Sequence, residues 1–111
     1  MDISFRQTDL QKTCSSQKKM IRTLGPECAQ KLRQRLMELQ AAENLAVISH
    51  LPPARCHELV GNRAGQFSVD LKHPFRLLFE PDHDPVPQKA DGGIDRTLVT
   101  AIIIVEIADT H

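Results

Sequence analysis

The spacing of apolar residues changes once along this chain, at Pro52-Pro53. Before the two prolines, apolar residues recur at every third or fourth position, which is typical of amphipathic helices. After them, apolar and polar residues alternate, which is typical of strands that bury one face. Helices in the first half of a chain and strands in the second half favour an α+β domain.

The first half predicts a short strand and a helical hairpin. Alternation over residues 3–5 indicates the strand. Two apolar stripes at helical spacing indicate helices over residues 9–24 and 26–42. Gly25 suits the end of the first helix, and Pro26 suits the first turn of the second. The two helices are therefore expected to run antiparallel, joined by a two-residue turn.

The second half predicts four strands, at residues 56–60, 67–71, 75–80 and 98–107. The last of them is rich in β-branched residues, which favours a central strand buried on both faces. Residues 1–111 are therefore expected to form a single α+β domain. An N-terminal strand and a helical hairpin would pack on a mostly antiparallel sheet, whose other face would stay open.

Composition excludes several classes of protein. The chain has 111 residues, 41% of them hydrophobic, and no net charge, so it can build a core without metals or disulfides. Its longest apolar run, Ala101 to Val105, is too short to span a membrane, and no secretory signal is apparent at its N-terminus. Because Cys14, Cys28 and Cys56 form no C-x-x-C pair, a reduced cytoplasmic protein with buried thiols is expected.

Charge is distributed unevenly along the chain. Residues 1–40 carry eight Lys and Arg against four Asp and Glu, whereas residues 81–111 carry two against six. This division argues against general affinity for nucleic acid, but it permits a local basic face that meets phosphate. The basic residues of the predicted helices form either a solvated surface or one that contacts RNA: Lys18, Lys19, Arg22, Lys31, Arg33 and Arg35.

Polar residues gather on the predicted open face of the sheet. They are Ser68, Asp70, Lys72, Arg76 and Glu80, with His57, Arg63, His73 and His111 on neighbouring segments. Arginine binds phosphate through two hydrogen bonds, and histidine exchanges protons near neutral pH. Such a set can cleave RNA without a metal: a base takes the 2′-OH proton, cations hold the phosphate, and an acid protonates the leaving 5′ oxygen. The simpler interpretation is a solvated strand face.

Two other combinations of residues are weaker candidates. Asp82-His83-Asp84 offers metal ligands but has no second ligand pair at a fixed spacing. Cys56-His57 joins a thiol to a base, but neighbours on a strand point to opposite faces. We therefore expect neither a metal site nor a cofactor.

Three segments carry a resemblance to a known family. They are the run from Arg55 to Leu71, the run from Lys72 to Phe79, and the ending Asp109-Thr110-His111. Together they resemble the HigB-type killer toxins of the RelE/ParE superfamily, which belong to type II toxin–antitoxin systems. The run from Lys31 to Leu36, followed by Ala41 to Leu45, is also similar, so the resemblance covers essentially the whole chain.

The resemblance implies a function and its partners. RelE-like toxins cleave mRNA on the translating ribosome, and an antitoxin neutralises them. For HigB toxins the antitoxin, HigA, is a helix-turn-helix protein, so operator DNA would be contacted only through it. The residues that match the family's active-site positions are His57, Arg76, Asp109 and His111, with Arg63 as a loop arginine and Lys72 at a position that is commonly cationic.

Two positions depart from the family pattern. Thr110 replaces the tyrosine of the usual Asp-Tyr-His ending, and Val60 stands where some relatives have lysine. Two alternative functions therefore stay open. One is a ParE-like toxin that binds gyrase and cleaves nothing. The other is a decayed toxin that acts only in a repressor complex with its antitoxin.

Overall fold

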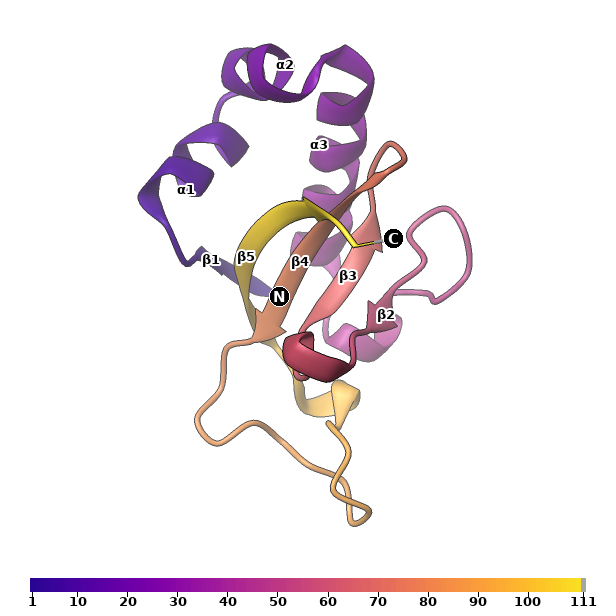
Figure 1. Ribbon diagram of the computed structural model, residues 1–111. Helices are drawn as coiled ribbons and strands as arrows, with labels where there is room; N and C mark the ends of the chain where they lie inside the picture. The colour runs from indigo at the N-terminus through magenta and orange to yellow at the C-terminus, as the bar shows by residue number, and fades with distance from the viewer. Residues whose placement is uncertain (111) are drawn as a thin grey trace.

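The computed structural model describes residues 1–110 and shows an α+β domain (Figure 1). The helices are α1 (Thr8–Cys14), α2 (Gln17–Leu24) and α3 (Pro26–Ala41). The strands are β1 (Asp2–Phe5), β2 (His57–Glu58), β3 (Phe67–Asp70), β4 (Phe75–Pro81) and β5 (Ala101–Asp109). They form one sheet in the order β1-β5-β4-β3-β2, in which only the β1–β5 pairing is parallel. The predicted fold class is therefore confirmed.

The first predicted helix is interrupted, and this corrects the expectation of one helix over residues 9–24. α1 ends before Ser15, and Ser16 caps the start of α2 with its Oγ, which accepts a hydrogen bond from the Lys19 amide at 3.2 Å. Serine side chains compete for backbone hydrogen bonds, so a Ser-Ser pair favours a cap over a helix interior. The junction of α2 and α3 is the single residue Gly25, which has a φ of 82°.

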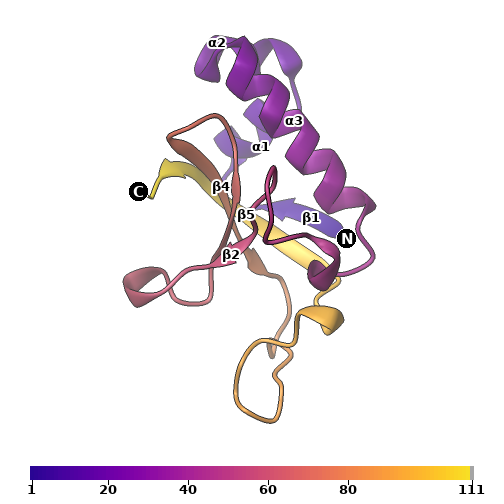
Figure 2. The same cartoon turned by 90° about the vertical axis from the view of Figure 1, so that its right-hand side faces the viewer.

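The helices cover one face of the sheet (Figure 2). Leu32 and Leu39 of α3 are fully buried against Phe67, Phe79 and the β5 isoleucines in one hydrophobic core. The Phe67 and Phe79 rings stack with their centroids 5.9 Å apart. No helix among residues 1–110 combines the length and the apolar character needed to cross a bilayer.

The predicted strand boundaries need two corrections. The strand expected at residues 56–60 shrinks to His57–Glu58. The strand expected at residues 98–107 begins only at Ala101, because Asp95 caps a short 3-10 turn over Arg96–Leu98. This strand, β5, lies between β1 and β4, but it is buried on one face only, because the helices cover only that face.

Candidate functional site

The sheet face opposite the helices carries a row of four residues, one from each of four strands. His57 pairs with Ser68, Ser68 with Leu78, and Leu78 with Glu106. Residues paired across antiparallel strands point to the same face. A second row, two residues further along, places Asp70 beside Arg76. We call this face, with His57, Ser68, Asp70, Arg76, Leu78 and Glu106, the site face.

A β-bulge puts Glu106 on the site face. Leu78 pairs with Glu106, but the next residue, Phe79, pairs with Ile104, so Val105 is the extra residue in β5. Without a bulge, Ile104 and Glu106 would point the same way, because side chains on a strand alternate. Ile104 is buried in the core on the helical side. The bulge therefore turns the Glu106 carboxylate away from the core.

Arg76 is fixed by a carboxylate. Its Nε lies 3.3 Å from Asp70 Oδ1 in an ion pair, and its Nη1 donates to Thr110 Oγ1 at 3.4 Å. The Arg76 side chain is only 13% exposed. The opposite oxygen of Asp70, Oδ2, lies 3.4 Å from Arg55 Nε, so one carboxylate joins two guanidinium groups.

The backbone around Asp70 is equally well held. Its amide donates to the Ala54 carbonyl at 2.7 Å, and its carbonyl accepts from Nε of the buried Arg35 at 2.8 Å. Arg55, which completes the cluster, has a φ of 49°, in the left-handed region that side chains other than glycine rarely adopt. Such strain is often found at functional sites and needs support from the surrounding structure.

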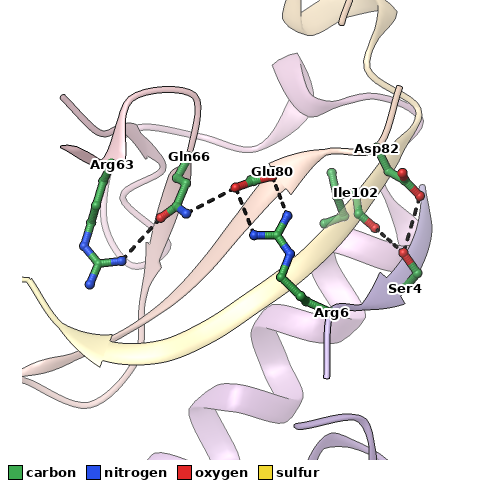
Figure 3. Close-up of polar contacts among 7 residues, drawn as sticks. All are labelled: Ser4, Arg6, Arg63, Gln66, Glu80, Asp82 and Ile102. Carbon is green, nitrogen blue, oxygen red and sulfur yellow. Dashed lines mark hydrogen bonds and ion pairs between the residues drawn. The ribbon is translucent and has the colours of Figure 1, made fainter. Parts of the chain in front are cut away.

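A chain of polar contacts ties the loop after β2 to the sheet (Figure 3). Arg63 Nη1 lies 3.4 Å from Gln66 Oε1, and Gln66 Nε2 donates to Glu80 Oε2 at 3.2 Å. Glu80 also accepts both Nη groups of Arg6, at 2.6 and 3.3 Å. At the Arg63 end of this series of contacts, Arg63 Nη1 also donates to Glu106 Oε1 at 2.6 Å. The face that was expected to be open is thus crossed by side chains, and Ser68 and Leu78 in the middle of the row are fully buried.

The Arg6–Glu80 pair predicts a pH dependence of stability. The hydrogen bonds from Arg6 lower the pKa of the Glu80 carboxyl, with a smaller contribution from Gln66. A lowered folded-state pKa contributes stability above the unfolded pKa, and this stability is lost as pH falls through the folded pKa. At pH 7 we expect Glu80→Gln to be about 0.5–1 kcal/mol less stable than the wild type, as for other partly exposed ion pairs. Urea unfolding at pH 7 and pH 3 measures the difference, which should become smaller at the lower pH as the Glu80 carboxyl takes up a proton; an equal difference at both pH values would contradict the assignment.

Lys72 and His73 do not lie with the rest of the predicted site. Lys72 forms an ion pair with Glu27 at the start of α3. Both residues line a hollow against the junction of α2 and α3, together with Phe75. The alternation that placed Lys72 beside Asp70 fails because β3 ends at Asp70 and the chain then turns.

The C-terminal ending is only partly described. Asp109 is the last residue of β5 and pairs with Phe75, so its register assigns it to the helical side of the sheet. Thr110 reaches Arg76 on the site face. His111, a predicted acid or base, lies outside the described residues.

Sequence reasoning missed two charged residues at this site. Arg55 shares Asp70 with Arg76, and Glu106 holds Arg63. Nothing local in the sequence predicts the positive φ of Arg55. Glu106 did offer a signal, because it is the one charged residue in an otherwise apolar stretch from Ala101 to Ala108.

The cations of the described residues fall into two groups. Eight have a carboxylate within 4.0 Å: Arg6, Arg35, Arg55, Arg63, Lys72, Arg76, Lys89 and Arg96. The other six form no such pair within residues 1–110, and all are exposed on α1, α2 and α3: Lys12, Lys18, Lys19, Arg22, Lys31 and Arg33. The positive charge that is not neutralised therefore lies on the helical layer.

The weaker candidates find little support. Cys56 and Cys28 are buried and Cys14 is half-buried, which fits the expected role of small apolar residues. Burial raises the pKa of Cys56 to about 11, so its thiol is protonated at neutral pH and is a poor nucleophile. His83 Nε2 accepts hydrogen bonds from the amides of Thr100 and Ala101, at 3.1 and 3.3 Å. Within residues 1–110, no three potential ligands among His, Cys, Asp and Glu come close enough to hold a metal.

Comparisons with known proteins add no relative. No protein-family model matches the chain, and a search of curated proteins also finds no match. The resemblance to HigB-type toxins therefore rests on the residues described above.

Proposed function

We propose that this protein is the toxin of a type II toxin–antitoxin system and cleaves mRNA on the translating ribosome. The observation that carries the proposal is the position of His57 and Arg76 on one sheet face. Strands β2, β3 and β4 bring them there from two segments of the sequence, and Arg63 reaches over the same face. A proton-transfer group and phosphate-binding cations on one surface are what metal-free RNA cleavage requires.

The proposed reaction is an attack of the RNA on itself. A base removes the proton of a 2′-OH, the 2′ oxygen bonds to the adjacent phosphorus, and the bond to the 5′ oxygen breaks. An acid protonates that oxygen, so the products are a cyclic phosphate and a 5′-OH. His57 and His111 are the candidates for base and acid. His57 is exposed, so a bound strand can reach it.

Arg76 would stabilise the charge that builds up on the phosphate. Asp70 forms an ion pair with the guanidinium, and Thr110 accepts a hydrogen bond from it, before any substrate arrives. A cation fixed in advance needs little rearrangement at the transition state, which is the main source of electrostatic catalysis. Asp70 is thus a positioning residue in this proposal.

The helical layer suits the proposed ribosomal partner. Six lysines and arginines on α1, α2 and α3 are exposed to solvent. Within residues 1–110, none of them has a carboxylate within 4.0 Å. Ribosomal RNA is a polyanion, and unpaired lysines and arginines gain most from contact with phosphates. The HigA-type antitoxin, the operator contact through it, and the cytoplasmic location follow from the resemblance alone.

Cleavage of a labelled mRNA on programmed ribosomes tests the proposal. We expect the wild type to cut the mRNA only when ribosomes are present. His57→Ala, and a chain that lacks His111, should cut about 100-fold more slowly, because general acid–base groups contribute about 10²–10⁴-fold. His50→Ala is the matched control, since His50 is an exposed histidine that lies outside the site face. Wild-type protein that is folded but leaves the mRNA intact would refute the nuclease.

Two observations favour a binding function without cleavage. Every arginine at the site face has a carboxylate partner, and Thr110 takes the place of the family tyrosine. Growth arrest with DNA damage and intact transcripts would support gyrase binding. No growth effect at all would support a partner that acts only with its antitoxin.

A further inference from the structure

The ion pair between Arg63 and Glu106 crosses the candidate site. Arg63 follows β2, and Glu106 lies on β5, at the far end of the row that begins with His57. The contact between Arg63 Nη1 and Glu106 Oε1, at 2.6 Å, therefore reaches over β3 and β4. The two residues beneath it in the row, Ser68 and Leu78, are fully buried.

This pair differs from the pair between Arg76 and Asp70. The side chains of Arg63 and Glu106 are 34% and 44% exposed, whereas those of Arg76 and Asp70 are 13% and 22% exposed. Asp70 is also held through its own backbone by Arg35. Within residues 1–110, the Glu106 carboxylate forms a hydrogen bond and an ion pair with Arg63 alone. Partly exposed pairs are weak and exchange readily, while buried pairs do not.

We propose that Glu106 is a built-in competitor for RNA, occupying on Arg63 the position that a backbone phosphate takes when RNA binds. The nature of the ligand, a single-stranded RNA, rests on the proposed function. The bulge at Val105 serves this role, because it is what turns Glu106 to the site face.

The proposal reverses the usual expectation for a polar residue at a binding site. A phosphate that binds Arg63 must first displace the Glu106 carboxylate, so part of its binding free energy is spent on breaking the ion pair. Removing the charge of Glu106 should release Arg63 for the phosphate. From the strength of partly exposed pairs, we expect Glu106→Gln to bind RNA about two- to fivefold more tightly.

Fluorescence anisotropy with a labelled RNA oligonucleotide tests the inference. Every 2′-OH of the probe is methylated, so it cannot be cleaved and binding is measured alone. The proteins are the wild type, Glu106→Gln and Glu43→Gln, at low salt. Glu43 is an exposed carboxylate just after α3, so its variant removes the same charge away from the site face. Glu106→Gln should bind more tightly than both other proteins, which should bind equally.

A double variant separates a local effect from a general one. Arg63→Ala should bind RNA more weakly than the wild type. Adding Glu106→Gln to Arg63→Ala should restore little RNA affinity, because Glu106 no longer has an Arg63 guanidinium to occupy. A gain of the same size in both backgrounds would overturn the inference, as would unchanged or weaker binding by Glu106→Gln. If none of the proteins binds the probe, the inference also fails. Tighter binding by Glu106→Gln without any cleavage on ribosomes would refute the nuclease and leave this inference standing.

Discussion

Arg76→Ala should lower the rate of ribosome-dependent mRNA cleavage by about 10²–10³-fold, the usual effect of removing one preorganised group that stabilises transition-state charge. Its guanidinium is the least exposed of the site-face arginines and is already oriented by Asp70 and Thr110. The rate is measured from the appearance of the cut product on programmed ribosomes. Growth of cells that express the variant gives a second measurement, because the toxicity should disappear.

Stability must be separated from chemistry in this experiment. Without Arg76, Asp70 keeps only Arg55 as an ion-pair partner among the described residues, and we expect a loss of about 1–3 kcal/mol. The double variant Arg76→Ala/Asp70→Asn removes the half-buried carboxylate that has lost one of its two cations, and it should recover part of that loss while staying inactive. Lys89→Ala, which removes an exposed cation from the loop between β4 and β5, should keep the cleavage chemistry. Full activity of Arg76→Ala would remove this residue from the mechanism.

Phe67→Ala is expected to produce the largest loss of stability, about 3–5 kcal/mol, as for other fully buried phenylalanines. The Phe67 ring is stacked on Phe79, and the Arg96 guanidinium lies 4.9 Å from its centroid. Removing it leaves a cavity between α3 and the sheet and frees Arg96 from its aromatic contact. In a domain of this size the melting temperature should fall by about 12 °C or more.

Phe75→Ala is the matched control for this cavity. Phe75 is on β4 of the same sheet but is 42% exposed, so a large part of its surface already meets water. The control should lose about 1 kcal/mol or less, which calorimetry or urea unfolding distinguishes easily from the loss in Phe67→Ala. Similar losses in the two variants would mean that the core is not centred on the aromatic stack.

The fold was predictable because its elements follow simple periodicities. Apolar spacing identified the helical layer, the N-terminal strand and the later strands, and the resulting α+β class is correct. The errors lie where a side chain that caps the backbone ends a helix or replaces the start of a strand. Ser15-Ser16 divides a helix whose apolar stripe continues on both sides, and Asp95 caps a turn in what looked like the start of a strand.

The candidate site was predictable only where alternation holds. His57 and Arg76 lie on the expected face because β2, β3 and β4 pair in register. Lys72 does not, because the alternation was extended past the end of β3. The sequence marks Glu106 as a lone charge in an apolar strand, but it does not assign this residue to the site face, since alternation with Ile104 would point it into the core. A bulge is a property of two paired strands, so one strand's sequence does not reveal it.

The parallel pairing of β1 with β5 has a consequence for how the chain is made. Asp2 pairs with Ala101 and Phe5 with Ile104, so the partner of β1 is synthesised almost a whole chain length later. Such distant contacts slow folding, because the chain must close a long loop before they form. During synthesis, β1 and β4 leave the ribosome before β5, the strand that lies between them in the sheet. The nascent protein therefore completes its sheet, and with it the site face, only after β5 has left the ribosome.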